Sequence, residues 1–184
     1  YIATIYQDYE DALYSENGIN PNTGKSYSDY VDVESTAKCY IMNELAKNLD
    51  GFRTSAYLYK ESGVDQLKMG PLWDYDLSFG VGAGVAANAS EQVKTDGLYT
   101  VRSLFAGRLY TMSDFRVAVK NEYQNSVMPL INNVLLGDIN SVGAEGKLHS
   151  LAWYRNELLK TACSDFTMWR SSSNPAGDLS LIHI

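Results

Sequence analysis

The sequence predicts an α+β fold that is mainly helical. Over most of the chain, apolar residues recur every three or four positions, as they do along the buried face of a helix. Only two short runs, 55–60 and 66–70, have the composition of β-strands, and turn-forming residues separate them. With 184 residues, of which 45% are hydrophobic and 20% charged, the chain has the length and composition of one globular domain.

The first predicted element is an amphipathic helix at the start of the chain, and a loop follows it. The apolar positions of this helix are Ile2, Ile5, Tyr6, Tyr9 and Leu13. The loop contains Asn17-Gly18 and the segment 20–24, which are rich in turn-forming residues. Because the helical pattern is already under way at Tyr1, we expect the chain to begin inside a longer protein.

A second helix and a β-hairpin are predicted next. Asp32 predicts the start of the helix, because a carboxylate at this position caps free backbone N–H groups, and Gly51 predicts its end. The hairpin has strands at Ser55–Lys60 and Gln66–Gly70 around the turn 61–65. The apolar face of the helix consists of Val33, Ala37, Tyr40, Ile41, Leu45 and Leu49.

The segment 80–95 is rich in glycine and alanine and is expected to be a mobile loop. Its Gly80–Gly84 run superficially resembles a phosphate-binding loop, but no Lys-Ser pair follows it. From Leu98 onward three helical stripes are predicted, and Ser113 is expected to cap the second. The stripes consist of Val101, Leu104, Phe105 and Leu109, then Phe115, Val119, Tyr123 and Val127, and finally Leu148, Leu151, Leu158 and Ala162.

The predicted domain extends over residues 1–170. Residues 171–178 are expected to form a loop-like tail, because serine, asparagine, proline and glycine dominate them. The last six residues, 179–184, match the translation of a transposon end that is common in sequencing libraries. We therefore expect them to be foreign to the protein, and we exclude His183 from any site.

Charge and composition bear on several classes of function. The net charge of −7, with scattered lysines and arginines, argues against a nucleic-acid partner. No stretch approaches the ~20 consecutive apolar residues of a transmembrane segment. Cys39 and Cys163 allow at most one disulfide, and a buried free thiol is the default for each. The fourteen tyrosines and three tryptophans leave open a surface protein that recognises polysaccharide.

Two acidic residues lie on either side of the predicted hairpin. Asp50 precedes it, and Asp74 follows it in the segment Trp73–Gly80. In protein kinases, an aspartate of the catalytic loop accepts the proton of the substrate hydroxyl, and a second aspartate before Phe-Gly holds magnesium. Asp50 taken alone would be a turn residue at the end of a helix. Its pairing with the Asp74 segment favours a phosphotransfer site instead.

Five short motifs carry a resemblance to a known family. They are Asp32-Val33-Glu34-Ser35, Asn43-Glu44-Leu45, Asn48-Leu49-Asp50-Gly51, Ser55-Ala56-Tyr57-Leu58-Tyr59-Lys60 and Gly70-Pro71-Leu72-Trp73-Asp74-Tyr75-Asp76-Leu77-Ser78-Phe79-Gly80. Together they resemble the CotH kinase family, atypical protein kinases first known from bacterial spore coats and found also in surface and secreted proteins. The resemblance is close over residues 28–80 and weaker from there to Arg170.

The resemblance implies a partial protein-kinase-like fold, a helical lobe whose β-hairpin carries the strand of the metal site. It implies Asp50 as the catalytic residue and Asp74 as a metal ligand. Asp76 would be a second metal ligand or would orient the loop. ATP and Mg²⁺ (or Mn²⁺) would be the cofactors, and Ser or Thr of a protein the substrate. Typical protein kinases have a metal-binding Asn five residues after the catalytic Asp, where this chain has Ser55, a poorer ligand.

In protein kinases, a lobe that covers ATP precedes this segment. We expect this lobe to be missing from the chain, which should therefore bind nucleotide poorly on its own. The resemblance does not identify the residues that bind the nucleotide. The alternative to an enzyme is a pseudokinase-like binding module of a secreted, spore or envelope protein that kept the fold and lost phosphate transfer. A spore coat, a cell surface and a secreted location all remain open.

Overall fold

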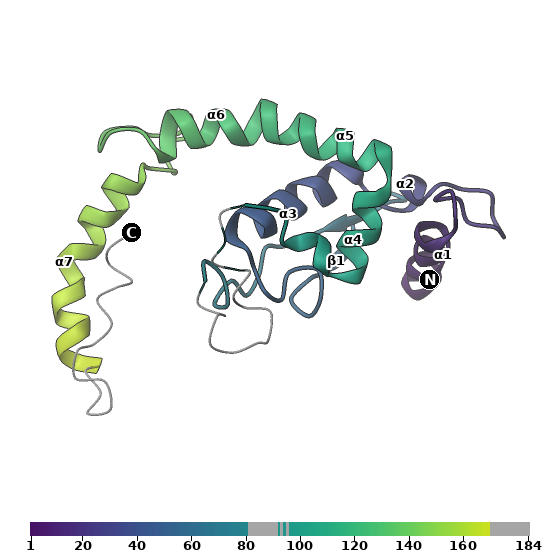
Figure 1. Cartoon of the computed structure of the whole chain (residues 1–184), viewed down its shortest axis with the longest axis horizontal. Helices are drawn as coiled ribbons and strands as arrows, with labels where there is room; N and C mark the ends of the chain where they lie inside the picture. Colours follow the sequence, from purple (N-terminus) through teal and green to yellow (C-terminus); the bar gives the residue numbers. More distant parts are fainter. Residues whose placement is uncertain (81–91, 93, 95, 170–184) are drawn as a thin grey trace. The chain divides into compact units, whose positions relative to one another are not determined.

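The computed structural model describes residues 1–80, 92, 94 and 96–169, and confirms the α+β, mainly helical class (Figure 1). The chain divides into two compact units, residues 1–123 and 124–184. The elements are α1 (Ile2–Tyr14), α2 (Tyr27–Tyr30), α3 (Val33–Ala46), β1 (Leu58–Lys60), β2 (Leu67–Met69), the 3-10 helix η3 (Thr100–Arg102), α4 (Leu104–Thr111), α5 (Ser113–Glu122), the π-helical turn η4 (Tyr123–Val127), α6 (Met128–Leu130), the π-helical turn η5 (Ile131–Leu135) and α7 (Leu151–Trp169).

Helix α1 and the loop after it are confirmed. The helix buries Tyr9, Ala12 and Leu13, whereas Ile2 at its start is exposed. A bridge between Ile19 and Ser26 closes the following loop. The short helix α2 was not predicted. Its first turn is capped by reciprocal hydrogen bonds between Ser26 and Asp29.

Helix α3 begins as predicted and ends earlier. The Asp32 carboxylate accepts a hydrogen bond from Ser35 N–H at 2.9 Å, which confirms the N-terminal cap. The prediction that the helix runs to Gly51 was wrong. Lys47 adopts a left-handed conformation with φ +46 and closes the helix after Ala46, because its N–H turns back to the carbonyls of Asn43 and Glu44.

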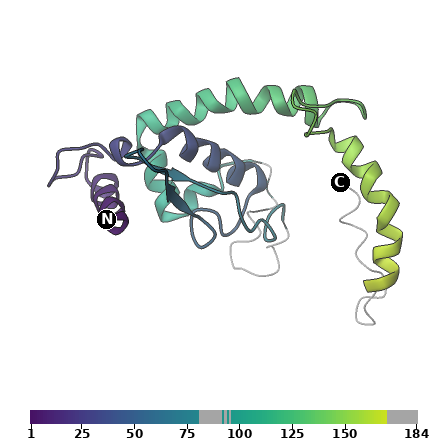
Figure 2. The same cartoon turned by 180° about the vertical axis from the view of Figure 1, so that it is seen from behind.

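The core of the first unit consists mainly of aromatic rings between α3 and its neighbouring helices. In both views α3 lies alongside α5 (Figures 1 and 2). The buried Tyr40 ring is 5.5 Å from Tyr110, 5.7 Å from Phe115 and 6.2 Å from Phe52, measured between ring centres. Cys39 is a buried free thiol, as predicted, and the side chain of Cys163 lies outside the described residues.

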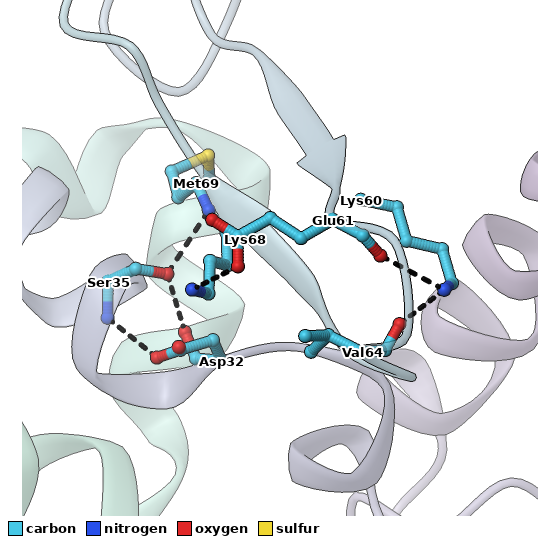
Figure 3. A network of polar contacts seen from close by, with 7 residues as sticks. All are labelled: Asp32, Ser35, Lys60, Glu61, Val64, Lys68 and Met69. Carbon is cyan, nitrogen blue, oxygen red and sulfur yellow. Dashed lines mark hydrogen bonds and ion pairs between the residues drawn. The ribbon is translucent and has the colours of Figure 1, made fainter.

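The predicted hairpin is confirmed, with shorter strands. β1 pairs with β2 in antiparallel register, Leu58 opposite Met69 and Lys60 opposite Leu67. It docks on the start of α3 through two hydrogen bonds to backbone atoms of β2. Asp32 N–H donates to the Leu67 carbonyl at 2.8 Å. Met69 N–H donates to the Ser35 hydroxyl at 3.2 Å (Figure 3). This docking fixes where the chain leaves the hairpin toward Asp74.

The helices after residue 98 differ in detail from the predicted stripes. Ser113 is the first residue of α5 and not its cap, because the chain turns in at Met112. Leu104 is 87% exposed, although it was assigned to an apolar stripe. Helix α7 begins at Leu151, so Leu148 precedes it. The predicted glycine-rich loop and the tail beyond residue 170 lie outside the described residues, apart from 80, 92 and 94. Within the described part of the chain, no helix is both long and apolar enough to cross a membrane.

Candidate functional site

Asp50 lies in a tight turn directly after α3. We define the Asp50 turn as residues 47–52. The Asp50 carbonyl accepts hydrogen bonds from the backbone N–H groups of Arg53, Thr54 and Ser55 at 3.1, 3.1 and 3.2 Å. Its own N–H donates to the side-chain oxygen of Asn48 at 3.2 Å. The backbone of Asp50 is therefore fixed, and its half-buried carboxylate accepts no hydrogen bond from the described residues.

The second acidic segment runs beside the end of α3. We define the Asp74 loop as residues 74–79. Phe79 N–H donates to the Ala46 carbonyl at 2.7 Å, and Leu49 N–H points to the Leu77 carbonyl at 3.5 Å. Asp74 and Asp76 are both exposed. The loop is thus attached to the same stretch of backbone that forms the Asp50 turn.

Two side chains connect the Asp50 turn with the Asp74 loop. The Ser55 hydroxyl donates to the Asp74 carboxylate at 3.0 Å, while Ser55 N–H is bonded to the Asp50 carbonyl. The Asn48 amide accepts from Asp50 N–H and donates to the Asp74 carbonyl at 3.4 Å. The structure therefore brings the Asp50 and Asp74 segments together. Asp76 lies on the same loop and makes no hydrogen bond to either segment among the described residues.

Backbone strain is concentrated in the same two segments. Within the described part of the chain, four non-glycine residues have a positive φ: Lys47 (+46), Phe52 (+58), Asp74 (+61) and Phe79 (+52). This conformation is uncommon for aspartate and an outlier for phenylalanine, and it costs on the order of 1–3 kcal/mol per residue. Residues held in this way cluster at functional sites, because only a surrounding structure that over-determines the backbone can maintain them.

Two residues that support the site, Gln92 and Asn48, were not predicted from the sequence. Gln92 is 3% exposed, and its side-chain amide donates to the Lys47 carbonyl at 2.7 Å and also to the Leu77 carbonyl. Nothing in the glycine- and alanine-rich segment around it indicates this contact. Asn48 is 2% exposed. The sequence gave only a weak indication of its role, namely its position two residues before Asp50. A polar residue that is buried in a turn requires hydrogen-bond partners.

Charged groups surround the buried Tyr99 next to the Asp50 turn. Burial raises the pKa of Tyr99; Arg102 opposes this rise, Asp50 adds to it, and Arg53 opposes it. The Arg102 guanidinium lies 5.3 Å from the centre of the Tyr99 ring. The Glu44 carboxylate holds this segment on α3 by accepting from the N–H groups of Tyr99 and Thr100, both at 2.8 Å. Asp50, Arg53 and Arg102 therefore all lie close enough to Tyr99 to act on its pKa.

A cavity of about 950 Å³ opens beside the Asp50 turn within the first unit. Leu49 and Gly51, the sequence neighbours of Asp50, line it together with Arg53. The other walls come from α1, from the hairpin and from the η3–α4 segment, through Tyr6, Leu58, Met69, Tyr99 and Phe105 among others. A ligand in this space would lie directly against the turn that carries Asp50.

The oxygen donors at this place fit a magnesium ion that is shared with a nucleotide. Magnesium prefers hard oxygen ligands and is usually held by one or two protein carboxylates together with substrate phosphates. Asp74 and Asp76 offer two exposed carboxylates. Among the described residues, no group of three or more histidine, cysteine or acidic side chains forms a metal cage. The donor set therefore suits a metal brought in with phosphate better than a resident structural ion.

The comparison with known proteins rests on a family model. The model described as "CotH kinase protein" matches residues 6–145, a range that includes Asp50, Asp74, Asp76 and the supporting residues Asn48, Ser55 and Gln92. Neither the curated proteins nor the solved structures gave a match. Because the family model spans most of the sequence, the chain belongs to the CotH kinase family.

Proposed function

We propose that this protein is an ATP- and divalent-metal-dependent phosphotransferase that phosphorylates serine or threonine residues of proteins. Membership of the CotH kinase family implies a kinase-like function. We assign Asp50 as the catalytic residue, Asp74 as a metal ligand and Asp76 as a second ligand or a residue that orients the loop. We further propose that the first unit corresponds to part of the helical lobe of a protein-kinase-like fold.

In the proposed reaction, the oxygen of the acceptor hydroxyl forms a bond to the γ-phosphorus of ATP. The bond between this phosphorus and the bridging oxygen breaks, ADP leaves, and the Asp50 carboxylate accepts the hydroxyl proton. The protein mainly has to position the groups and balance their charge, because this reaction requires little covalent work from it. The metal ion, when bound with ATP at Asp74 and Asp76, supplies positive charge next to the phosphates.

The observation that carries this proposal is the pair of links between the Asp50 turn and the Asp74 loop. Ser55 is bonded to both segments, and so is Asn48. A base and a metal ligand must face one triphosphate, so their backbones have to be held at a fixed separation. The left-handed conformation of Asp74 supports the same assignment, because its cost is expected where function requires it.

A phosphate-transfer assay tests the proposal. The protein is incubated with γ-labelled ATP, Mg²⁺ or Mn²⁺ and a serine-rich protein acceptor. We expect label in the acceptor and a rate that falls roughly a thousandfold or more in Asp50→Ala and in Asp74→Ala, since each 1.36 kcal/mol of barrier is tenfold in rate. The matched control is Asp65→Ala, which removes an exposed aspartate from the hairpin turn and should leave the rate unchanged.

Other results would contradict the proposal in distinguishable ways. Nucleotide binding with no transfer in the wild-type protein would identify a pseudokinase-like binding module instead of an enzyme. Equal labelling by the wild type and both aspartate variants would remove Asp50 and Asp74 from the mechanism. Binding of a polysaccharide that survives both substitutions, without any transfer, would favour a surface protein that recognises sugars.

A further inference from the structure

Asn48 occupies the point at which the Asp50 turn and the Asp74 loop meet. Its side chain is 2% exposed, so the amide has little access to water. The backbone of Asn48 is fixed as well, because its N–H donates to the Asn43 carbonyl at 3.0 Å and its carbonyl accepts from Gly51 N–H at 3.4 Å. The side chain therefore projects from a fixed position.

Both ends of the Asn48 amide are used, one for each segment. The oxygen accepts from Asp50 N–H at 3.2 Å, and the nitrogen donates to the Asp74 carbonyl at 3.4 Å, 26 residues further along the chain. A short side chain that offers an acceptor and a donor at its two ends is found only in asparagine, since an ionised aspartate only accepts. Leaving either end unpaired in a buried place costs free energy.

We propose that Asn48 is a positioning residue that sets the separation between Asp50 and Asp74. This inference rests on the function proposed above and assigns a role that the acidic residues alone do not explain. Asn48 reaches only backbone atoms of the two segments, so it acts through them and not on a substrate. Ser55 differs in this respect, because its hydroxyl is bonded to the Asp74 carboxylate itself.

The loop has other attachments, so removing the Asn48 amide should shift the loop without releasing it. Phe79 N–H remains bonded to the Ala46 carbonyl at 2.7 Å, and Gln92 still bridges Lys47 and Leu77. Ser55 keeps its bond to Asp74. We therefore expect an effect on catalysis and on local exchange, with the fold retained.

The chain offers a matched control in Asn20. This asparagine is also buried, and its amide also joins two segments, mainly through backbone atoms. Its oxygen accepts from the N–H groups of Asn22 and Thr23 at 2.8 and 3.2 Å, and its nitrogen donates to the Asp8 carbonyl at 3.0 Å and to the Asp8 carboxylate at 3.4 Å. It lies in the loop after α1 and has no hydrogen bond to the Asp50 turn or the Asp74 loop.

The test compares Asn48→Ala and Asn48→Asp with Asn20→Ala and Asn20→Asp. Asn48→Asp keeps an acceptor for Asp50 N–H but replaces the donor to the Asp74 carbonyl by an oxygen. Hydrogen exchange of the amides in residues 74–79, measured by mass spectrometry on the chain, reports on the loop without requiring activity. The kcat and the KM for ATP are measured in parallel on the active form of the protein.

We expect both Asn48 variants to lower kcat about 10- to 100-fold, as residues that support metal ligands typically do, and to speed exchange in residues 74–79. The Asn20 variants should lower the Tm while leaving kcat and exchange in that segment as in the wild type. If the Asn48 variants keep the wild-type kcat and exchange, the inference is wrong. The inference is also wrong if kcat falls in proportion to Tm to the same extent in the Asn48 variants and in the Asn20 variants. If the wild type shows no transfer, the proposed function fails, and loop exchange alone decides the role of Asn48.

Discussion

In the aromatic core around Tyr40, contacts are made by whole ring faces and edges, whereas the Asp50 turn and the Asp74 loop are joined by single hydrogen bonds. The core contacts are non-directional and depend mainly on the apolar area that is buried. Each contact between the two acidic segments depends on one donor and one acceptor at a fixed separation. Stability is therefore expected to depend on side-chain volume in the core and on the type of atom, donor or acceptor, near the acidic residues.

The largest effect on stability is expected in the core. Phe115 is fully buried, and its ring centre lies 5.7 Å from that of Tyr40. Replacing it by alanine leaves a cavity, so Phe115→Ala should lower the free energy of unfolding by about 3–5 kcal/mol in urea denaturation. The control is Val117→Ala on the same helix, a residue 57% exposed, which should change stability by no more than about 0.5 kcal/mol. Equal losses in both variants would contradict a volume-dependent core.

A smaller effect is expected at Gly51, where the turn depends on the absence of a side chain. A Cβ atom at this position would lie 2.0 Å from the side-chain oxygen of Asn43. Asn43 has little freedom to move away, because its amide donates to the Cys39 carbonyl at 2.9 Å. Gly51→Ala should therefore cost about 1–3 kcal/mol of unfolding free energy.

A double-mutant cycle identifies the cause of this cost. In the Asn43→Ala background the obstructing amide is gone, so Gly51→Ala should cost clearly less than in the wild type. The same cost in both backgrounds would show that the turn is sensitive for another reason. This result would weaken the contrast between a core that depends on volume and a turn that depends on single contacts.

The smallest effect is a dependence of stability on pH that comes from Cys39, a buried member of the core. Burial raises the pKa of this thiol to about 11 from its ordinary value of 9.0, and the hydrogen bond from Asn43 opposes the rise. The folded state therefore binds more protons than the unfolded state between pH 9 and pH 11. Consequently, the free energy of unfolding should fall across this window as pH rises, by at most about 1.4 kcal/mol per pH unit.

Cys39→Ala provides the comparison for this prediction. Denaturation curves are measured at about pH 8, 9, 10 and 11, which spans the range in which the thiol titrates. The free energy of unfolding should decline less steeply with pH for Cys39→Ala than for the wild type. Burial, and to a smaller extent the charge of Cys39, raises the pKa of Tyr75 to about 12. Tyr75 is present in both proteins, so the part of its shift that comes from burial cancels in the difference. Parallel curves for the two proteins would mean that Cys39 does not titrate differently on folding.

The sequence predicted the regular elements better than their ends. Helix α1, the Asp32 cap of α3 and the hairpin were confirmed, because they depend on neighbouring residues and on periodicity. The end of α3 was placed at Gly51, although Lys47 closes the helix in a conformation that no local propensity of lysine indicates. Leu104 has the spacing of a buried residue but is exposed. Spacing along the sequence does not determine which apolar helix positions pack against another element.

The α+β class, the order of the main elements and a resemblance that the family model confirms could all be read from the sequence. Which polar atoms meet at the acids depends on the tertiary structure. Ser55 and Asp74 are 19 residues apart, and Gln92 reaches Lys47 across 45 residues. Periodicity is a local property of the chain. Hydrogen bonds between distant segments arise only once the hairpin has docked and left-handed residues such as Asp74 and Phe79 have turned the backbone back onto α3.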